Sequence, residues 1–320
     1  MMHRFPALIV VLAAGMTVAG CRSEVRQKPE VSLSRTPTGF PRTLADGRGK
    51  TITLQAAPQR IVSLIPSDTE VLYALGAGDR IAAVTTADDY PPEVKQKPTL
   101  NNVFTSDIEQ ILARKPDLVV AVGSLNQKPI AALEALHIPV LAVDPKSLAD
   151  TYASIRLLGQ AVGAEKKAEE IVGGMQARLV VVQAVVAKAV HRPRVLILYS
   201  TAPIYTTGPN SFIDDLITQA GGQNIVDRPI STNIISSEEV ALRQPEVILC
   251  SKSLTEKVRN MPGWARSVPA VKNNRLYAEE PEDGTLVRPT PRLVRGVEAL
   301  ARYLHPELDW KPLVKESARP

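Results

Sequence analysis

The chain has 320 residues, of which 44% are hydrophobic and 22% charged, and its net charge is +5. This length suits two globular domains better than one, and the composition excludes a largely disordered chain. Because no block of Lys and Arg interleaves with aromatic residues, we expect no nucleic-acid partner.

Residues 1–20 are predicted to form a lipoprotein signal peptide. Arg4 gives a positive start, and the apolar stretch that follows carries no charge until Arg22. Plain secretion and an uncleaved membrane anchor are the alternatives, the anchor because this stretch is close to the minimum length that spans a bilayer. The residues Val-Ala-Gly-Cys, ending at Cys21, resemble the bacterial lipobox, in which the cysteine is lipidated and cleavage precedes it. We therefore expect lipidation of Cys21 and an exported chain, anchored to a bacterial membrane and facing the periplasm or the cell exterior.

The two cysteines predict a fold without disulfides. Lipidation would consume Cys21 and leave Cys250 without a partner. Cys250 ends the strand-like segment EVILC, where a buried strand residue is expected. No histidine stands at metal-ligand spacing from another His, Cys or acid, so we expect neither a metal site nor a cofactor.

Residues 21–42 are polar, contain proline and have no period, which predicts a flexible tether. The segment RTLADGRGKTITL then alternates around Asp46-Gly47 and indicates a short β-hairpin.

A strand–helix alternation begins at Arg60. The segment RIVSLI predicts a strand, and PSDTEVLYALGAG predicts a helix with Ser67 as N-cap, Glu70 completing a capping box and Gly76 as the stop. Short strands that alternate with helices predict βαβ units and a parallel sheet. The further strands are RIAAVT, LVVAV and VLAV, with helices over 106–114 and 127–136.

Residues 164–190 predict an unusually long helix, which Pro193 ends. At 1.5 Å per residue it would span about 40 Å, enough to run along one lobe and reach another. Gly173-Gly174 is a local weak point in it. The alternation then resumes with strands RVLILYS, QNIV, EVILC and RLYAE, a helix from 237 and a last helix over 291–304.

The fold class that follows is α/β, with two Rossmann-like lobes of parallel sheet joined by one long backbone helix. The expected boundaries are 60–308 for the folded region, with lobe one over 60–146, the backbone helix over 164–190 and lobe two over 193–308.

One αβ unit occurs twice in the sequence. IEQILARKPDLVV covers 108–120 and SEEVALRQPEVIL covers 237–249, so that Glu109 and Glu238 are 129 residues apart. Each glutamate lies in a first helical turn, after Asp107 or Ser236 as expected N-caps, where a carboxylate interacts favourably with the helix dipole by roughly 0.3–1 kcal/mol. This structural role is sufficient by itself, and docking to a partner is the alternative.

The whole pattern resembles the helical-backbone class of substrate-binding proteins of ABC importers, which serve cobalamin, ferric siderophores and haem. The match runs from about Arg60 to His305, and the loop DDYPP and the turn at Tyr205–Gly208 look most like the cobalamin-binding branch. The other segments that carry the resemblance are RIVSLIPSDTEVLYALG, EQILARKPDLVVA, YTTGPNSFIDDLITQAGGQNI and RPTPRL.

The resemblance implies partners and a docking site. In the cobalamin branch one glutamate on each lobe contacts arginines of the membrane permease, and these positions fall on Glu109 and Glu238 here. A permease with its ATPase is then the expected partner, with the protein itself a monomer. Charge pairs of this kind suit steering and register more than raw affinity.

The ligand is expected between the lobes, at the carboxyl ends of the parallel strands. Tyr90 and Tyr205 could each lay a ring against a large planar ligand. The candidate residues are Asp89, Tyr90, Asn102 and Phe104 from lobe one, and Tyr199, Tyr205, Thr232 and Arg288 from lobe two.

This chain departs from the cobalamin binders at several pocket positions. They place tryptophans where it has Val103, Val122 and Thr232, and a tyrosine where it has Ala87. A different corrinoid, a haem and a ferric siderophore therefore all stay open as ligands, and Arg288 suits an anion as well as an amide-rimmed corrin.

Two other classes of function are alternatives. A lone scavenger or sensor lipoprotein would share the fold and lack a permease. A two-domain α/β enzyme such as a glycosyltransferase is disfavoured, because the sequence has no Gly-rich phosphate loop after a first strand and no visible acid/base constellation.

Overall fold

The computed structural model describes residues 39–101, 107–229, 233–279, 286 and 288–311, which belong to one compact unit over 38–320. The predicted signal peptide and the lipidation site Cys21 lie outside the described residues. In the part that is described, no helix is both long and apolar enough to cross a membrane.

The predicted hairpin is confirmed. Strands β1 (Arg42–Ala45) and β2 (Thr51–Leu54) pair antiparallel, and so Arg42 at the end of the expected tether already lies in a strand. The Asp46 carboxylate closes the turn by accepting from the backbone N–H groups of Arg48 and Lys50.

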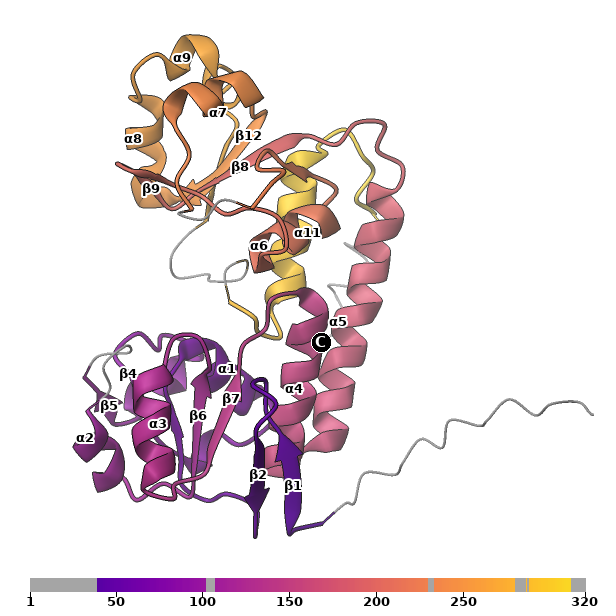
Figure 1. Cartoon of the computed structure of the whole chain (residues 1–320). Coiled ribbons are helices and arrows are strands. Elements are labelled where there is room, and N and C mark those ends of the chain that lie inside the picture. The colour runs from indigo at the N-terminus through magenta and orange to yellow at the C-terminus, as the bar shows by residue number, and fades with distance from the viewer. Residues whose placement is uncertain (1–38, 102–106, 230–232, 280–285, 287, 312–320) are drawn as a thin grey trace, which may run out of the picture. The chain divides into compact units, whose positions relative to one another are not determined.

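The first parallel sheet has the described order β5-β4-β3-β6-β7 (Figure 1). Its strands are almost entirely buried, as expected of a sheet covered on both faces. Strand β5 was not predicted, because two residues give no readable period. The strands are β3 (Ile61–Ser63), β4 (Ile81–Thr85), β5 (Thr99–Leu100), β6 (Leu118–Val122) and β7 (Val140–Val143), and the helical segments are α1 (Pro66–Ala74), η1 (Gly78–Arg80), η2 (Pro92–Gln96), α2 (Ile108–Ala113) and α3 (Gln127–Ala135).

The predicted cap of α1 is wrong. Pro66 occupies the first helical turn, the N-cap is Ile65, and Ser67 lies inside the helix. A proline at this place needs no partner for its missing N–H and has a suitable φ, so it starts the helix earlier than a serine cap would. Glu70 does not complete a capping box either, because its carboxylate binds Arg292. Gly76, with φ of +79°, follows the last turn as expected.

Two helices, α4 (Leu148–Val162) and α5 (Glu165–Val186), connect the sheets and pack against each other (Figure 1). Their close approach requires Gly159, where a Cβ would lie 2.5 Å from the Cβ of Ala168. The backbone helix α5 has 22 residues, or about 33 Å, and is shorter than the predicted rod. Gly173-Gly174 does not interrupt it.

The second parallel sheet has the described order β11-β8-β12-β13 (Figure 1). With it, the predicted α/β fold of two parallel sheets and a backbone helix is confirmed. Cys250 is a buried strand residue, as expected. The strands are β8 (Arg194–Leu198), β9 (Ser200–Thr201), β10 (Ile204–Tyr205), β11 (Gln223–Asn224), β12 (Val247–Ser251) and β13 (Leu276–Glu279), and the helical segments are α6 (Phe212–Gln219), α7 (Ser237–Arg243), η3 (Lys252–Leu254), α8 (Thr255–Arg259), α9 (Trp264–Ser267), α10 (Pro269–Lys272) and α11 (Leu293–Leu304).

The sequence repeat is a structural repeat. The pairs α2–β6 and α7–β12 correspond under the same offset of 129 residues. Lys115 and Gln244, the residues before the two prolines, both have φ of +49° and end their helices in the left-handed region. The predicted N-caps Asp107 and Ser236 are confirmed, since each side chain accepts from a backbone N–H of the first turn.

Candidate ligand-binding site

The candidate site is built on loops that follow the carboxyl ends of strands. The loop with Asp88, Asp89 and Tyr90 follows β4 in the first sheet, and Tyr199 directly follows β8 in the second. Ligands of open parallel sheets bind at this end of the strands.

The side chain of Asp88 holds the loop after β4 in place by local hydrogen bonds. Its carboxylate accepts from the Thr85 backbone N–H at 2.8 Å and from the Thr85 hydroxyl at 2.5 Å. The Thr85 hydroxyl in turn accepts from the Ala87 backbone N–H at 3.2 Å. These local bonds give the loop a defined shape before any ligand is present.

A second carboxyl, Asp68 of α1, is buried beside Asp88. Burial, with a smaller contribution from the charge of Asp88, raises the pKa of Asp68 well above its ordinary value of 3.8. Burial also raises the pKa of Asp88, although hydrogen bonds from Thr69 and Thr85 partly oppose this. Burial, more than the like charge of Asp88, therefore favours the neutral form of the Asp68 carboxyl.

Asp89 and Arg288 form an ion pair that joins two segments 199 residues apart. Both guanidinium Nη groups donate to the carboxylate, with Nη2 2.9 Å from Oδ2. Partial burial opposes ionisation of Asp89, but the hydrogen bonds and charge of Arg288 outweigh it, so the pKa of Asp89 lies below its ordinary value. The sequence predicted both residues as ligand contacts, and the structure brings them together.

A second arginine, Arg292, was missed as a site residue. Its Nε and Nη2 donate to the Glu70 carboxylate at 2.7 and 2.8 Å, and its guanidinium lies 3.8 Å from the centre of the Tyr90 ring. The pair therefore holds the aromatic ring of the loop in place. The sequence contained one sign of this pair, which was Glu70 itself. Glu70 is an acid on a buried helix, and no base stands near it in the sequence.

The second group of predicted residues comes from the loops after β8. The Tyr199 backbone N–H donates to the Tyr205 carbonyl at 2.9 Å, and Tyr205 forms a β-bridge with Ile234. These three side chains and Tyr90 are exposed, by 51% for Tyr199, 41% for Tyr205, 39% for Ile234 and 38% for Tyr90. Ile234 belongs to the STNII loop, in which the sequence named Thr232.

Several expected positions cannot be placed. Asn102, Phe104 and Thr232 lie outside the described residues, as does Val103. Of the two other positions at which aromatic residues were expected in cobalamin binders, Val122 is buried at the end of β6 and Ala87 is exposed on the loop after β4.

Glu109 and Glu238 lie on α2 and α7 and are both exposed. A hydrogen bond to its own backbone amide, with a further one from the Ser236 hydroxyl, lowers the pKa of Glu238. The neighbouring Glu239 has a different role, because it pairs with Arg243 and Arg228. Each repeat thus presents a carboxylate from the first turn of its helix at the protein surface.

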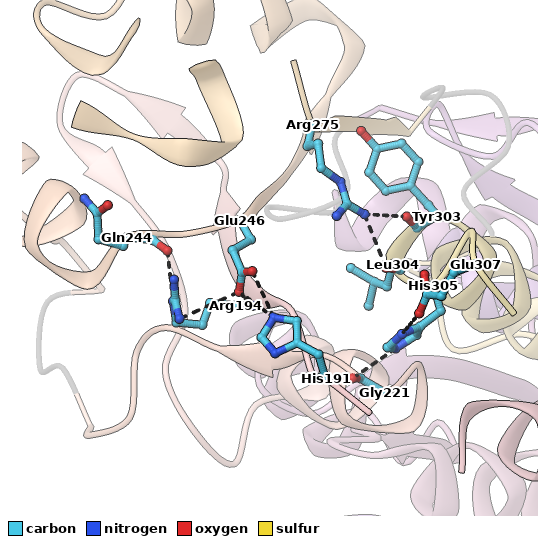
Figure 2. Close-up of polar contacts among 10 residues, drawn as sticks. All are labelled: His191, Arg194, Gly221, Gln244, Glu246, Arg275, Tyr303, Leu304, His305 and Glu307. Atoms are coloured by element: carbon cyan, nitrogen blue, oxygen red, sulfur yellow. Dashed lines mark hydrogen bonds and ion pairs between the residues drawn. The ribbon is translucent and has the colours of Figure 1, made fainter. Parts of the chain in front are cut away.

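A cavity of about 410 Å³ lies at the opposite end of the second sheet. Its lining includes Pro193 and Arg275, which directly precede β8 and β13. Several of its polar groups have partners, which Figure 2 draws. His191 contacts Glu246 at 2.9 Å, His305 donates to the Gly221 carbonyl at 3.2 Å, and Arg275 donates to the Tyr303 carbonyl at 2.8 Å. A second cavity, of about 350 Å³, is lined by residues of α6 and β11. The first cavity does not lie at the carboxyl ends of the strands.

Within the described ranges, no group of three or more His, Cys, Asp or Glu residues is arranged to hold a metal ion. The candidate site therefore offers aromatic faces and paired charges. Such groups bind and orient a ligand by stacking and hydrogen bonding.

Comparison with known proteins gives one consistent result. The family profile described as periplasmic binding protein matches residues 61–282. The chain is 34% identical over 306 residues to the uncharacterized ABC transporter substrate-binding lipoprotein YvrC of Bacillus subtilis, covering 93% of this chain and 96% of that one. It is 33% identical to the vitamin B12-binding protein of Pectobacterium atrosepticum, over 78% of this chain and 89% of the relative.

Two solved structures have the same fold. The periplasmic vitamin B12 binding protein BtuF of Vibrio cholerae superposes with a TM-score of 0.69 at 29% identity, over 78% of this chain and 97% of that one. The periplasmic heme-binding protein RhuT from Roseiflexus sp. RS-1 gives a TM-score of 0.69 at 27% identity, over 78% of this chain and 98% of the other.

Proposed function

The chain belongs to the periplasmic binding protein family, and from this membership we propose that it captures cobalamin or a related corrinoid for an ABC importer. The observation that carries the proposal is similarity along nearly the whole chain to a substrate-binding lipoprotein, and along most of it to vitamin B12-binding proteins. A binding role, and not catalysis, is the function of such a transport component.

The candidate site supports a large ligand with flat faces. Tyr90 and Tyr199 are exposed on loops that follow β4 and β8, and Tyr205 is exposed at the end of the short strand β10. Each of these exposed tyrosines offers a ring face for stacking together with a hydroxyl for a hydrogen bond. A corrin and a porphyrin both present flat faces on which such rings can stack.

Delivery is proposed to use Glu109 and Glu238 as contacts for arginines of the permease. Both carboxylates are exposed, and they occupy equivalent places in the two repeats. A permease that holds the binding protein at both points can register it and draw its two lobes apart. The ATPase of the importer would supply the energy. Lipidation at Cys21 would keep the protein near the permease.

Haem and ferric siderophores are the alternative ligands. RhuT is described as a heme-binding protein, and its TM-score against this chain equals that of BtuF. Isothermal titration of the purified protein with cyanocobalamin, haemin and a ferric catecholate separates the three, and we expect cyanocobalamin to bind most tightly.

Uptake of labelled cyanocobalamin by cells tests the transport role. Cells lacking the native copy should lose uptake at limiting concentrations and regain it with the wild-type chain. Uptake that is unchanged by the deletion, with a protein that still binds its ligand, would instead identify a lone scavenger or sensor lipoprotein.

A further inference from the structure

We propose that the Asp89–Arg288 pair is a charge filter that makes the candidate site select uncharged chelates over anionic ones. The inference rests on the proposed function, because it concerns the ligand of the same site. It distinguishes between the possible ligand classes by their charge. Neither the fold nor the named relatives make this distinction.

Both arginines at the site already have carboxylate partners. Arg288 binds Asp89 through two nitrogens, and Arg292 binds Glu70 in the same way. Two guanidinium charges are therefore balanced by two carboxylates. A guanidinium that donates two of its five N–H groups to a carboxylate already has its charge balanced, so it attracts a further ligand anion less strongly.

The two pairs differ in how accessible they are to a ligand. The Glu70 side chain is only 3% exposed and that of Arg292 is 15% exposed, so this pair is part of the support under Tyr90. The Asp89 side chain is 39% exposed and that of Arg288 is 19% exposed. A ligand that reaches the loop after β4 therefore meets Asp89 before it meets either guanidinium.

An anionic ligand group gains little from this arrangement. To form the same two-bond contact with Arg288 it must displace Asp89, and at any other edge of the guanidinium it still stands near that carboxylate as a like charge. Residues 86–91 of this loop contain no Lys or Arg, and the neighbour of Asp89 in the sequence is another acid, Asp88, anchored to Thr85.

An uncharged ligand group can bind without breaking the pair. A primary amide can donate its N–H groups to the exposed oxygens of Asp89, which accept more than one hydrogen bond each. The ion pair then stays intact and holds the loop in the shape that presents Tyr90. The geometry thus favours a ligand rimmed with amides over one rimmed with carboxylates.

The test uses ligand pairs that differ only in charge. Cyanocobalamin is compared with its monocarboxylic acids, in which one side-chain amide is hydrolysed, and haemin dimethyl ester is compared with haemin. Each probe is titrated into the purified full mature chain as wild type, Asp89→Asn, Arg288→Gln and the double variant. Glu169→Gln is the matched control, because Glu169 forms a comparable two-bond pair with Arg156 on the exposed surface of α5.

We expect the wild type to bind the uncharged member of each pair more tightly. Asp89→Asn frees Arg288, so binding of the anionic member should tighten by about tenfold, and binding of the uncharged member should weaken because the carboxylate that accepts from its amides is gone. The double variant should lose this gain because the guanidinium is gone, and Glu169→Gln should change neither ratio. Circular dichroism melting confirms that each variant is folded.

The outcomes separate this inference from the function on which it rests. If one ligand pair binds and Asp89→Asn leaves the ratio of its two affinities unchanged, the charge filter is wrong and the binding function stands. If the wild type prefers the anionic member, the filter is likewise wrong. If neither pair binds, the proposed function fails, and the inference falls with it.

Discussion

Glu109 and Glu238 head equivalent helices of two structural repeats and are both exposed to solvent. We predict that they matter for transport and not for ligand affinity, because the candidate ligand residues lie on other loops. An exposed charge pair contributes about 0–1 kcal/mol, so one Glu→Ala change should reduce uptake only partly. Changing both to Lys replaces attraction with repulsion and should nearly abolish it.

Calorimetry on the purified double Lys variant and uptake by cells lacking the native copy check this prediction together. Glu239→Gln is a suitable control, since Glu239 lies beside Glu238 but is engaged by Arg243. A collapse of ligand binding in a folded double variant would place the glutamates in the pocket. Unimpaired uptake would reduce them to helix-terminus residues.

Cys21→Ala should release the protein from the membrane or block its processing. The reason is that the expected thioether lipid forms on the cysteine sulfur, and the alanine side chain has none. Fractionation of cells, with the mature size read by electrophoresis, is the measurement. A Cys21→Ala protein that remains membrane-bound at the normal mature size would show that another segment anchors it.

Substitution by alanine should raise the stability at two glycines of α5, Gly173 and Gly174, and lower it at Gly221, which packs against α5. A Cβ at Gly173 or Gly174 would meet no atom within 4 Å, and both lie exposed within α5. Each change to Ala should raise the free energy of unfolding by roughly 0.5–1 kcal/mol. Gly221 has φ of +81°, and a Cβ there would lie 2.7 Å from Nε2 of His305 and also against Val186.

Gly221→Ala should therefore lower the free energy of unfolding by about 1–3 kcal/mol. Urea denaturation of the three variants decides the matter. A loss of stability at Gly173 or Gly174 would mean that these positions serve an interface, and an unchanged midpoint for Gly221→Ala would contradict the packing of Gly221 against His305.

Asp68 predicts a specific pH dependence of stability. Its pKa is raised in the folded state, above the ordinary value of 3.8, so the folded protein binds the proton more tightly than the unfolded chain. The contribution of this carboxyl to the free energy of unfolding is then fully present below pH 3.8. That contribution is lost as the pH rises toward the folded-state pKa. Asp68→Asn removes this loss, because the amide is uncharged at every pH.

We expect Asp68→Asn to raise the free energy of unfolding at pH 7 relative to wild type and to change it little near pH 4. Denaturant titrations at a series of pH values give the comparison. A variant that is less stable than wild type by the same amount at every pH would show that the Asp68 carboxyl is ionised and satisfied in the folded state.

Local signals in the sequence predicted most of the fold. Asp107 and Ser236 are N-caps as expected, because a cap depends on residues within three positions of itself. The branched runs of β6 and β12 are strands for the same reason, since their pattern is contained in five residues each. Strand β5 was too short to show a period.

The sequence could not show which residues far apart in the chain form ion pairs with each other. Glu70 looked like half of a capping box, and its actual partner Arg292 is 222 residues away. The pairing of Asp89 with Arg288 likewise joins distant loops, although both residues were expected at the site. Pairings of this kind depend on how the elements pack, which no local pattern encodes.

The absorption spectrum of the protein purified from its native host tests the central claim most directly. A captured chelate absorbs visible light, and corrinoids, haems and ferric catecholates have bands at different wavelengths. We predict a corrinoid spectrum that is retained on gel filtration and released on unfolding. A Soret band, a catecholate charge-transfer band, or a colourless protein that still fails to bind added cyanocobalamin would contradict the account.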